Sequence, residues 1–198
     1  VEVAIAQLST HDQFFMMAEG GKIDYASHAN DGGTVLREVL DFDKAIKVAY
    51  DFYMQHPDET LIVVTADHET GGMALGNSDY TLNLKVLAEQ KCSSDLLSDQ
   101  LSALQKEAGK YLTWEQVKEV ISKNTGLYTV VEISTEEDQL LQAAFEQMMQ
   151  HQGVEKSLYK DINALASKAL ALLNQKSRLG WTSKGHTASA VPVFAIGV

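Results

Sequence analysis

The sequence predicts an α/β protein with a mostly helical insertion, and three observations indicate this. The run Leu61-Ile-Val-Val-Thr65 is β-branched and continuously apolar, which is typical of a parallel strand buried on both faces. Residues 34–53, just before it, have apolar side chains at helical spacing. Residues 81–180 show helical patterns and helix-start signals instead. We therefore expect a partial α/β domain at 1–80, a helical insertion at 81–180 and a return to the sheet at 181–198.

The first 80 residues are predicted to form a strand–helix–strand unit. Phe14-Phe-Met-Met17 is a short apolar run that Glu19-Gly-Gly21 ends, so we expect a buried strand there. The helix over 34–53 should stop at His56-Pro57-Asp58, because proline disfavours helical backbone in the residue before it. Leu61–Thr65 then supplies the second strand, and the three elements make a βαβ unit.

The middle of the chain is predicted to be helical. Thr113-Trp-Glu-Gln116 and Ser134-Thr-Glu-Glu137 both fit a capping box, in which the first and fourth residues satisfy each other's backbone N–H groups. The expected helices cover residues 94–108, 114–123, 135–151 and 155–176. Val191-Pro-Val-Phe-Ala-Ile196 should return to the sheet as a strand, with Pro192 near its start or on an edge.

The composition is that of a globular protein, with 45% apolar and 22% charged residues in 198. The net charge of −11 argues against a nucleic-acid binder, which needs a basic face to neutralise phosphates. Residues 1–80 hold 4 basic and 14 acidic side chains, a net charge of −10. Crowded carboxylates repel one another, and bound divalent cations would relieve that repulsion. A solvated acidic face would explain the same charge.

The cysteine count, the absence of a long apolar run and the chain ends give little information on the compartment in which the protein works. Cys92 is the single cysteine, so no disulfide forms within the chain. No run of about 18 apolar residues predicts a membrane span, and no signal peptide is visible. Val1-Glu-Val-Ala-Ile-Ala-Gln-Leu8 has the pattern of a helix already under way, and the chain stops just after a strand-like run. We expect an internal piece of a longer protein.

Two acid–histidine pairs could bind a metal ion. Asp24 and His28 are four residues apart, so on a helix both side chains lie on one face, and a carboxylate with an imidazole is a usable zinc pair. A chance pair on a solvated helix has the same spacing. Asp67 and His68 follow the strand at Leu61–Thr65, where α/β sheets bind their ligands. An aspartate that caps the next helix and a packed histidine would also fit there.

Two further side chains are candidates by position. Glu19 follows the run Phe14–Met17 and would offer Mg²⁺ a hard oxygen ligand. A loop glutamate that binds no metal would fit the sequence equally well. His186 lies in a loop just before the last predicted strand. The remaining histidines have no acidic or histidine partner at a telling spacing and are expected on the surface: His11, His56 and His151.

Taken together, three blocks of this sequence resemble the alkaline phosphatase family. Phe14-Phe-Met-Met-Ala-Glu-Gly-Gly-Lys-Ile-Asp-Tyr-Ala-Ser-His28 is similar to the family's strand and E-G-x-x-I-D-x-x-x-H block. Thr65-Ala-Asp-His-Glu-Thr-Gly-Gly72 is similar to its T-A-D-H block, and Gly185-His186-Thr187 to its last histidine. The blocks occur in the family's order. The resemblance covers residues 1–80 and 181–198, and the family often has a variable insertion between them.

The resemblance implies an alkaline-phosphatase-like sheet domain, partial in this chain, and a role for each candidate. By that resemblance the metal ligands are Asp24, His28 and His186 for a first zinc, Asp67 and His68 for part of a second, and Glu19 for magnesium. The family hydrolyses phosphate monoesters: a serine activated at the second zinc attacks phosphorus, and the phosphoserine is then cleaved at the first. Family habit also suggests a periplasmic or secreted homodimer.

The sequence departs from the family in what it lacks. The family's serine follows an aspartate, and no Asp-Ser dipeptide occurs in these 198 residues. The carboxylate that completes the second zinc and magnesium sites, and the arginine that grips phosphate, also belong to the family's N-terminal part. We therefore expect the nucleophile outside this chain. Two alternatives stay open: a phosphodiesterase, phosphomutase or sulfatase of the same superfamily, and a non-catalytic helical or adaptor domain with incidental Asp–His pairs.

Overall fold

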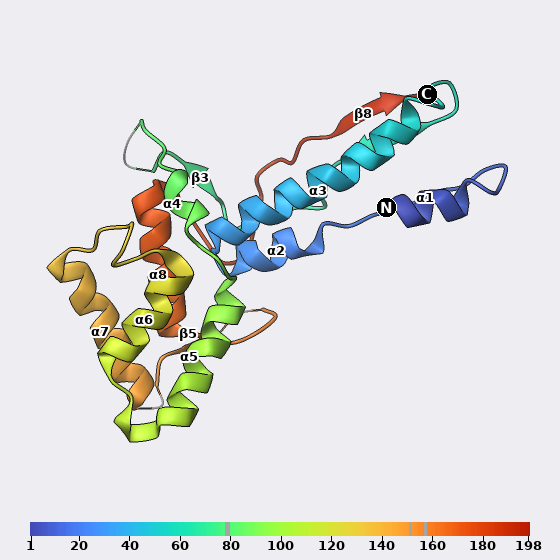
Figure 1. Ribbon diagram of the computed structural model, residues 1–198. Helices are drawn as coiled ribbons and strands as arrows, with labels where there is room; N and C mark the ends of the chain where they lie inside the picture. Colours follow the sequence, from blue (N-terminus) through green and yellow to red (C-terminus); the bar gives the residue numbers. More distant parts are fainter. Residues whose placement is uncertain (78–79, 151, 157) are drawn as a thin grey trace.

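The computed structural model describes the chain except for residues 78–79, 151 and 157. Figure 1 shows two parts. We call α1–α3, β1 and β8 the elongated part, and the group of helices α5–α8, with the strands β4 and β5 between α7 and α8, the helical part. The helices of the chain are α1 (Glu2–Leu8), α2 (Gly21–His28), α3 (Gly32–Tyr53), α4 (Lys85–Ala88), α5 (Ser94–Ala108), α6 (Trp114–Thr125), α7 (Thr135–Met149) and α8 (Ala164–Ser177), with a 3-10 turn at Gly109–Tyr111. The strands are β1 (Leu61–Val64), β2 (Glu69–Thr70), β3 (Ala74–Leu75), β4 (Val154–Glu155), β5 (Ile162–Asn163), β6 (Leu179–Gly180), β7 (His186–Thr187) and β8 (Phe194–Gly197).

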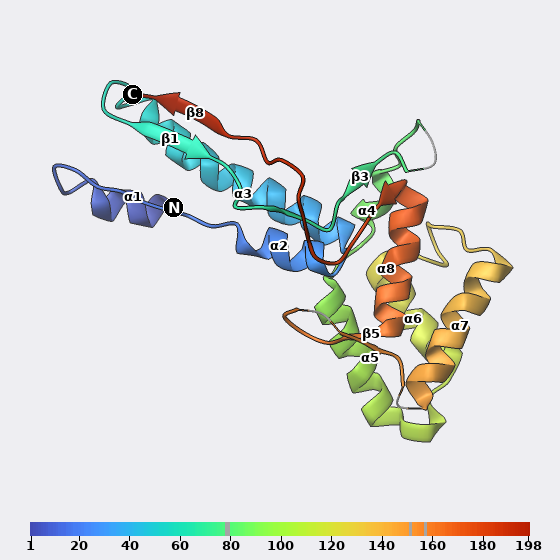
Figure 2. The ribbon, with the colours of Figure 1, turned by 180° about the vertical axis from the view of Figure 1, so that it is seen from behind.

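The last strand of the chain, β8, pairs with β1, the strand that the sequence pattern predicts most clearly. This return of the chain end to β1 was predicted. β8 pairs with β1, with Leu61 opposite Gly197 and Val64 opposite Phe194. The pairing is antiparallel, so the prediction of a central parallel strand is wrong for the strands that the structure describes. β1 is also not buried on both faces, because Leu61 and Val63 are 56% and 54% exposed. α3 lies along β1 (Figure 2), and exposure alternates along the strand.

The strand predicted at residues 14–17 does not form. This segment is extended and links α1 to α2, and no strand of the described chain pairs with it. Phe15 and Met17 are 89% and 81% exposed, although Phe14 packs its ring near Phe52 at 5.8 Å between centroids. A strand needs a hydrogen-bonded neighbour, and an apolar run alone cannot supply one. The expected βαβ unit is therefore reduced to α3 and β1.

The helices of the middle segment largely match their predictions. α5 covers the predicted residues 94–108, and both capping boxes form at the starts of α6 and α7. The helix expected over 155–176 begins only at Ala164, because residues before it pair in the β4–β5 hairpin and Asn163 caps α8. Within the described part of the chain, no helix combines the length and apolarity that a membrane crossing needs.

The buried apolar side chains gather in the helical part. The main cluster runs from Leu87 to Leu179 along the chain and includes the fully buried Leu97, Leu101 and Leu165. Among the described residues, the elongated part adds partly buried side chains such as Leu36 at the edge of this cluster. Burial of this cluster stabilises the helical part, whereas α3, β1 and β8 keep several apolar side chains exposed. The division of the chain at residues 80 and 180 remains a prediction.

A buried carboxylate joins the two parts. Asp31 is 1% exposed and caps α3 by accepting a hydrogen bond from the Thr34 backbone N–H at 3.0 Å. It also accepts from the Gln90 side chain at 2.5 Å and from the Ser94 backbone N–H, in the first turn of α5, at 2.7 Å. One carboxylate thus accepts hydrogen bonds from backbone N–H groups in the first turns of two helices, where such groups lack intrahelical partners.

We predict that Asp31→Asn lowers the free energy of unfolding by about 1–3 kcal/mol, because an amide NH₂ would then face the Ser94 N–H donor. Urea unfolding followed by circular dichroism measures this. Asp43→Asn, an exposed aspartate of the same helix, is the matched control and should stay within about 0.5 kcal/mol of wild type. Equal losses in both variants would contradict the role given to Asp31.

Candidate metal centre

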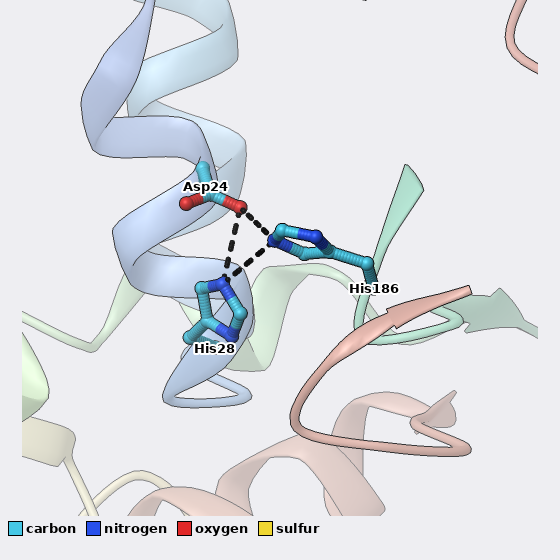
Figure 3. A group of neighbouring side chains, drawn as sticks. All are labelled: Asp24, His28 and His186. Atoms are coloured by element: carbon cyan, nitrogen blue, oxygen red, sulfur yellow. Dashed lines mark hydrogen bonds and ion pairs between the residues drawn. The ribbon is translucent and has the colours of Figure 1, made fainter. Parts of the chain in front are cut away.

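Helix α2 positions two of the predicted ligands. Asp24 and His28 lie one turn apart on the same face, with Asp24 Oδ1 and His28 Nε2 separated by 3.4 Å. His28 ends the helix and is 4% exposed. The predicted shared face of these two residues is therefore confirmed, and both point out of α2 toward β7 (Figure 3).

A short ladder brings the third side chain to the helix. β2 pairs with β7 antiparallel, and Thr70 lies opposite His186. His186 Nε2 lies 3.2 Å from His28 Nε2 and 3.8 Å from Asp24 Oδ1. The three ligand atoms all lie within 4.8 Å of one another (Figure 3), although His186 follows His28 by 158 residues. We call Asp24, His28 and His186 the Asp–His–His cluster.

The hydrogen bonds of His28 leave a metal-binding lone pair in the cluster. Its Nδ1 lies 2.6 Å from the backbone carbonyl of Lys184. A carbonyl only accepts, so Nδ1 is the donor and Nε2 of the neutral ring keeps its lone pair. That lone pair faces a carboxylate oxygen and a second imidazole nitrogen. Three such atoms suit a cation, and Asp with two His is a zinc donor set.

Asp24 is held in its charged form. The Thr70 hydroxyl donates to Oδ1 and the Tyr159 hydroxyl donates to Oδ2, each at 2.7 Å. Burial pushes the pKa of Asp24 upward, but these hydrogen bonds and the nearby His28 and His186 outweigh it and leave the pKa lowered. The same hydrogen bond to Asp24, with burial and neighbouring charges, raises the pKa of Tyr159 to about 12, so its hydroxyl stays a donor.

A second pair of donor atoms lies beside the cluster. Because the Thr70 hydroxyl donates to ionised Asp24, it must accept from His68 Nδ1, which is 3.1 Å away. His68 Nε2 then keeps its lone pair and faces Asp67 Oδ2 at 3.2 Å. The His68 ring stacks on His186 with centroids 3.5 Å apart. Asp67 and His68 are thus neighbours of the cluster through this stacked ring, with the Asp67 side chain 85% exposed.

The other candidates lie outside the cluster. Glu19 is exposed on the segment before α2 and is not among the three clustered side chains of the described residues. His11 and His56 are exposed, as expected. The expectation for His151 falls outside the described residues.

Sequence reasoning missed three groups that fix the ligands. Thr70 bridges Asp24 and His68, and only its place two residues after His68 hinted at a role. Tyr159 lies 135 residues from Asp24, and nothing in its local sequence marked it. The Lys184 carbonyl is a backbone group, which no side-chain motif can reveal.

Gly71 shapes the loop that carries these groups. Its φ is +87°, and a Cβ there would lie 2.7 Å from the Trp181 ring and 3.1 Å from the Ser27 carbonyl. Its N–H donates to the Gly185 carbonyl at 2.9 Å, and its own carbonyl accepts from the N–H groups of Thr182 and Ser183. A glycine at this position lets the loop after β2 close onto the segment before His186.

Comparisons with known proteins show what the whole chain is similar to. A family model described as alkaline phosphatase matches residues 1–198. Alkaline phosphatase 4 of Bacillus subtilis (strain 168) is 32% identical over 185 residues, which are 93% of this chain and 34% of that protein. A crystal structure of a cold-active alkaline phosphatase from a psychrophilic Shewanella sp. is 30% identical with a TM-score of 0.75, covering 99% of this chain and 43% of that chain.

A crystal structure of Thermus thermophilus alkaline phosphatase is also similar, with 25% identity and a TM-score of 0.70 over 99% of this chain and 41% of that one. These likenesses define a partial α/β domain with the alkaline phosphatase fold. The chain belongs to the alkaline phosphatase family. It spans about a third of the length of the curated relatives that it matches.

We predict that the stability contributed by Asp24 depends on pH. Its folded pKa is lowered, so the contribution is complete above the ordinary aspartate value of about 3.9 and is lost as the pH falls through the lower folded value. In chelator-treated protein, Asp24→Asn should reduce the free energy of unfolding at pH 7 by about 1 kcal/mol. The gap from wild type should close below about pH 4.

Urea unfolding at several pH values measures this gap. Asp12→Asn, an exposed aspartate near α1, serves as the control and should give no gap at any pH. A gap for Asp24→Asn that stays constant down to pH 2 would contradict the assignment.

Proposed function

We propose that this chain is part of a metal-dependent phosphomonoesterase that hydrolyses phosphate monoesters. The observation that supports this most is the Asp–His–His cluster, in which one ligand atom from each of three side chains meets in a chain of the alkaline phosphatase family. Because the chain spans about a third of its curated relatives, activity is proposed for the whole enzyme rather than for these residues alone.

In this proposal the donor atoms divide into three sets. Asp24 Oδ1, His28 Nε2 and His186 Nε2 hold a first zinc ion. Asp67 and His68 supply part of a second zinc site, and Glu19 supplies an oxygen to magnesium. When bound, such a cation pair stabilises the negative charge on the entering and leaving oxygens of an in-line phosphoryl transfer.

The chain's own residues orient this donor set. The Lys184 carbonyl holds His28 in the tautomer that aims Nε2 at the cluster. Thr70 ties the Asp24 carboxylate to His68 and so links the two proposed sites. Residues 1–80 carry a net charge of −10, which would repel a phosphate dianion. Bound cations at the cluster would offset this charge where the substrate sits.

The nucleophile is proposed to lie outside these 198 residues. The chain has no Asp-Ser dipeptide, the setting in which the family carries its serine. We propose the phosphoserine route for the whole enzyme on the ground of family membership. We also propose that residues 81–180 are an insertion within the α/β domain, and that the whole enzyme is an exported homodimer.

We predict that the 198-residue chain shows turnover of p-nitrophenyl phosphate close to background with Zn²⁺ and Mg²⁺ present. The reason is that positioned donors without a nucleophile cannot form the covalent intermediate. Release of p-nitrophenol followed by absorbance measures this. Turnover comparable to that of an intact phosphatase would show that the nucleophile lies within the chain.

We predict that the chain binds Zn²⁺ and that His186→Ala removes the tightest site, weakening it more than about 100-fold, because a direct ligand should matter more than its supporting groups. Isothermal titration calorimetry measures this, with His11→Ala, an exposed histidine near α1, as the matched control. His11→Ala should bind as wild type does. Absence of zinc binding by the wild type would instead favour a non-catalytic domain.

A further inference from the structure

The β4–β5 hairpin of the helical part reaches across to the metal centre. Between its two strands, Tyr159 places its hydroxyl 2.7 Å from Asp24 Oδ2 and donates to it. Asp24 Oδ1 is the oxygen that faces His28 Nε2 and His186 Nε2. The hairpin thus holds the outer oxygen of the carboxylate, and the inner oxygen, which also accepts from Thr70, faces the cluster.

Aromatic contacts fix the position of Tyr159. Its ring stacks on Tyr25 with centroids 3.7 Å apart and planes 21° apart. It also meets the edge of the His28 ring at 5.6 Å. Lys22 Nζ lies 4.8 Å from the centroid of the Tyr25 ring. Stacked and edge-on aromatic pairs stabilise one ring orientation, and in this orientation the hydroxyl of the half-exposed Tyr159 meets the carboxylate.

The same hairpin also contacts Lys184, the residue whose backbone carbonyl accepts from His28. Glu155, in β4, forms an ion pair with the Lys184 ammonium and accepts a hydrogen bond from Ser167 Oγ at 2.8 Å. The backbone carbonyl of Lys184 is the group that accepts from His28 Nδ1. Glu155 therefore contacts, through the Lys184 ammonium, the residue whose backbone carbonyl accepts from His28.

The hairpin is anchored in the core of the helical part. Ile162 of β5 is 4% exposed and belongs to the buried apolar cluster. The Asn163 backbone N–H donates to Ser98 Oγ at 2.8 Å, and Lys160 pairs with Asp99 at 2.7 Å. These contacts tie the hairpin to α5, so the position of Tyr159 follows that of a packed helix.

We infer that the β4–β5 hairpin is a positioning element for the Asp–His–His cluster, in which Tyr159 orients the Asp24 carboxylate and Glu155 orients Lys184 and, through it, His28. The inference rests on the proposed function, because it assumes that the cluster binds a metal ion. Tyr159 is a positioning residue and not a ligand, since its hydroxyl faces the oxygen away from the cluster. The helical part thereby has a direct role in the site that the elongated part carries.

The test measures Zn²⁺ affinity by competition with a chromophoric chelator for four proteins. They are the wild type, Tyr159→Phe, Glu155→Gln and the control Tyr111→Phe, whose ring is 77% exposed on the 3-10 turn beyond α5. Loss of a hydrogen bond to a ligand typically weakens metal binding about 10–100-fold. Tyr159→Phe should therefore bind about tenfold more weakly, Glu155→Gln should also weaken binding, and Tyr111→Phe should match the wild type.

A second readout separates positioning from general destabilisation. In the Co²⁺-loaded chain, visible absorption reports ligand geometry, so Tyr159→Phe should shift the bands as the carboxylate turns. Its thermal unfolding midpoint without metal should stay within a few degrees of wild type. A lowered midpoint with unchanged Co²⁺ bands would mean a merely structural role and would overturn the inference.

The remaining outcomes distinguish this inference from the proposed function. If the wild type binds Zn²⁺ and both hairpin variants bind it equally tightly, with unchanged Co²⁺ spectra, the positioning role is wrong and the proposed function stands. If the wild type binds no Zn²⁺, the proposed function fails, and the positioning role fails with it because there is no metal site to position.

Discussion

The buried carboxylate of Asp31 is the interaction on which the arrangement of the two parts depends. It caps α3 and accepts from the first turn of α5, so a single side chain bonds to helices of both parts. His28 lies three residues earlier, at the end of α2, and its position follows from the same junction. A carboxylate removed from water needs donors on each oxygen, and both Asp31 oxygens have them. Asp31 therefore links α3, which follows the ligand helix α2, to α5, on which the hairpin is anchored.

A second constraint acts at the site itself, where hydrogen bonds fix which atoms keep lone pairs. The Lys184 carbonyl and the Thr70 hydroxyl each take the Nδ1 hydrogen of a histidine, which leaves two Nε2 atoms facing carboxylate oxygens. Lone pairs at 3.2–3.4 Å repel unless a proton or a cation lies between them. A cation bound between these atoms would relieve the repulsion, as would a proton on the histidine, and only the cation belongs to the proposed phosphatase role.

Local signals predicted well what depends on neighbours in sequence. The capping boxes at Thr113 and Ser134 and the shared face of Asp24 and His28 follow from short-range geometry, and the structure has them. Two predictions were wrong: that residues 14–17 form a strand, and that Leu61–Val64 lies in a parallel sheet. Both depend on strand pairing, and the partners of a strand lie far along the chain. Tyr159 could not be predicted for the same reason: its only signal is a contact across 135 residues. The family resemblance supplied His186, whose local sequence is an ordinary loop.

The most direct test of the central claim is anomalous diffraction at the zinc edge from crystals of the chain grown with one equivalent of Zn²⁺. The account predicts a peak about 2.0–2.2 Å from Asp24 Oδ1, His28 Nε2 and His186 Nε2 together. A peak at other side chains, or ordered density for these three residues without a peak between them, would contradict it.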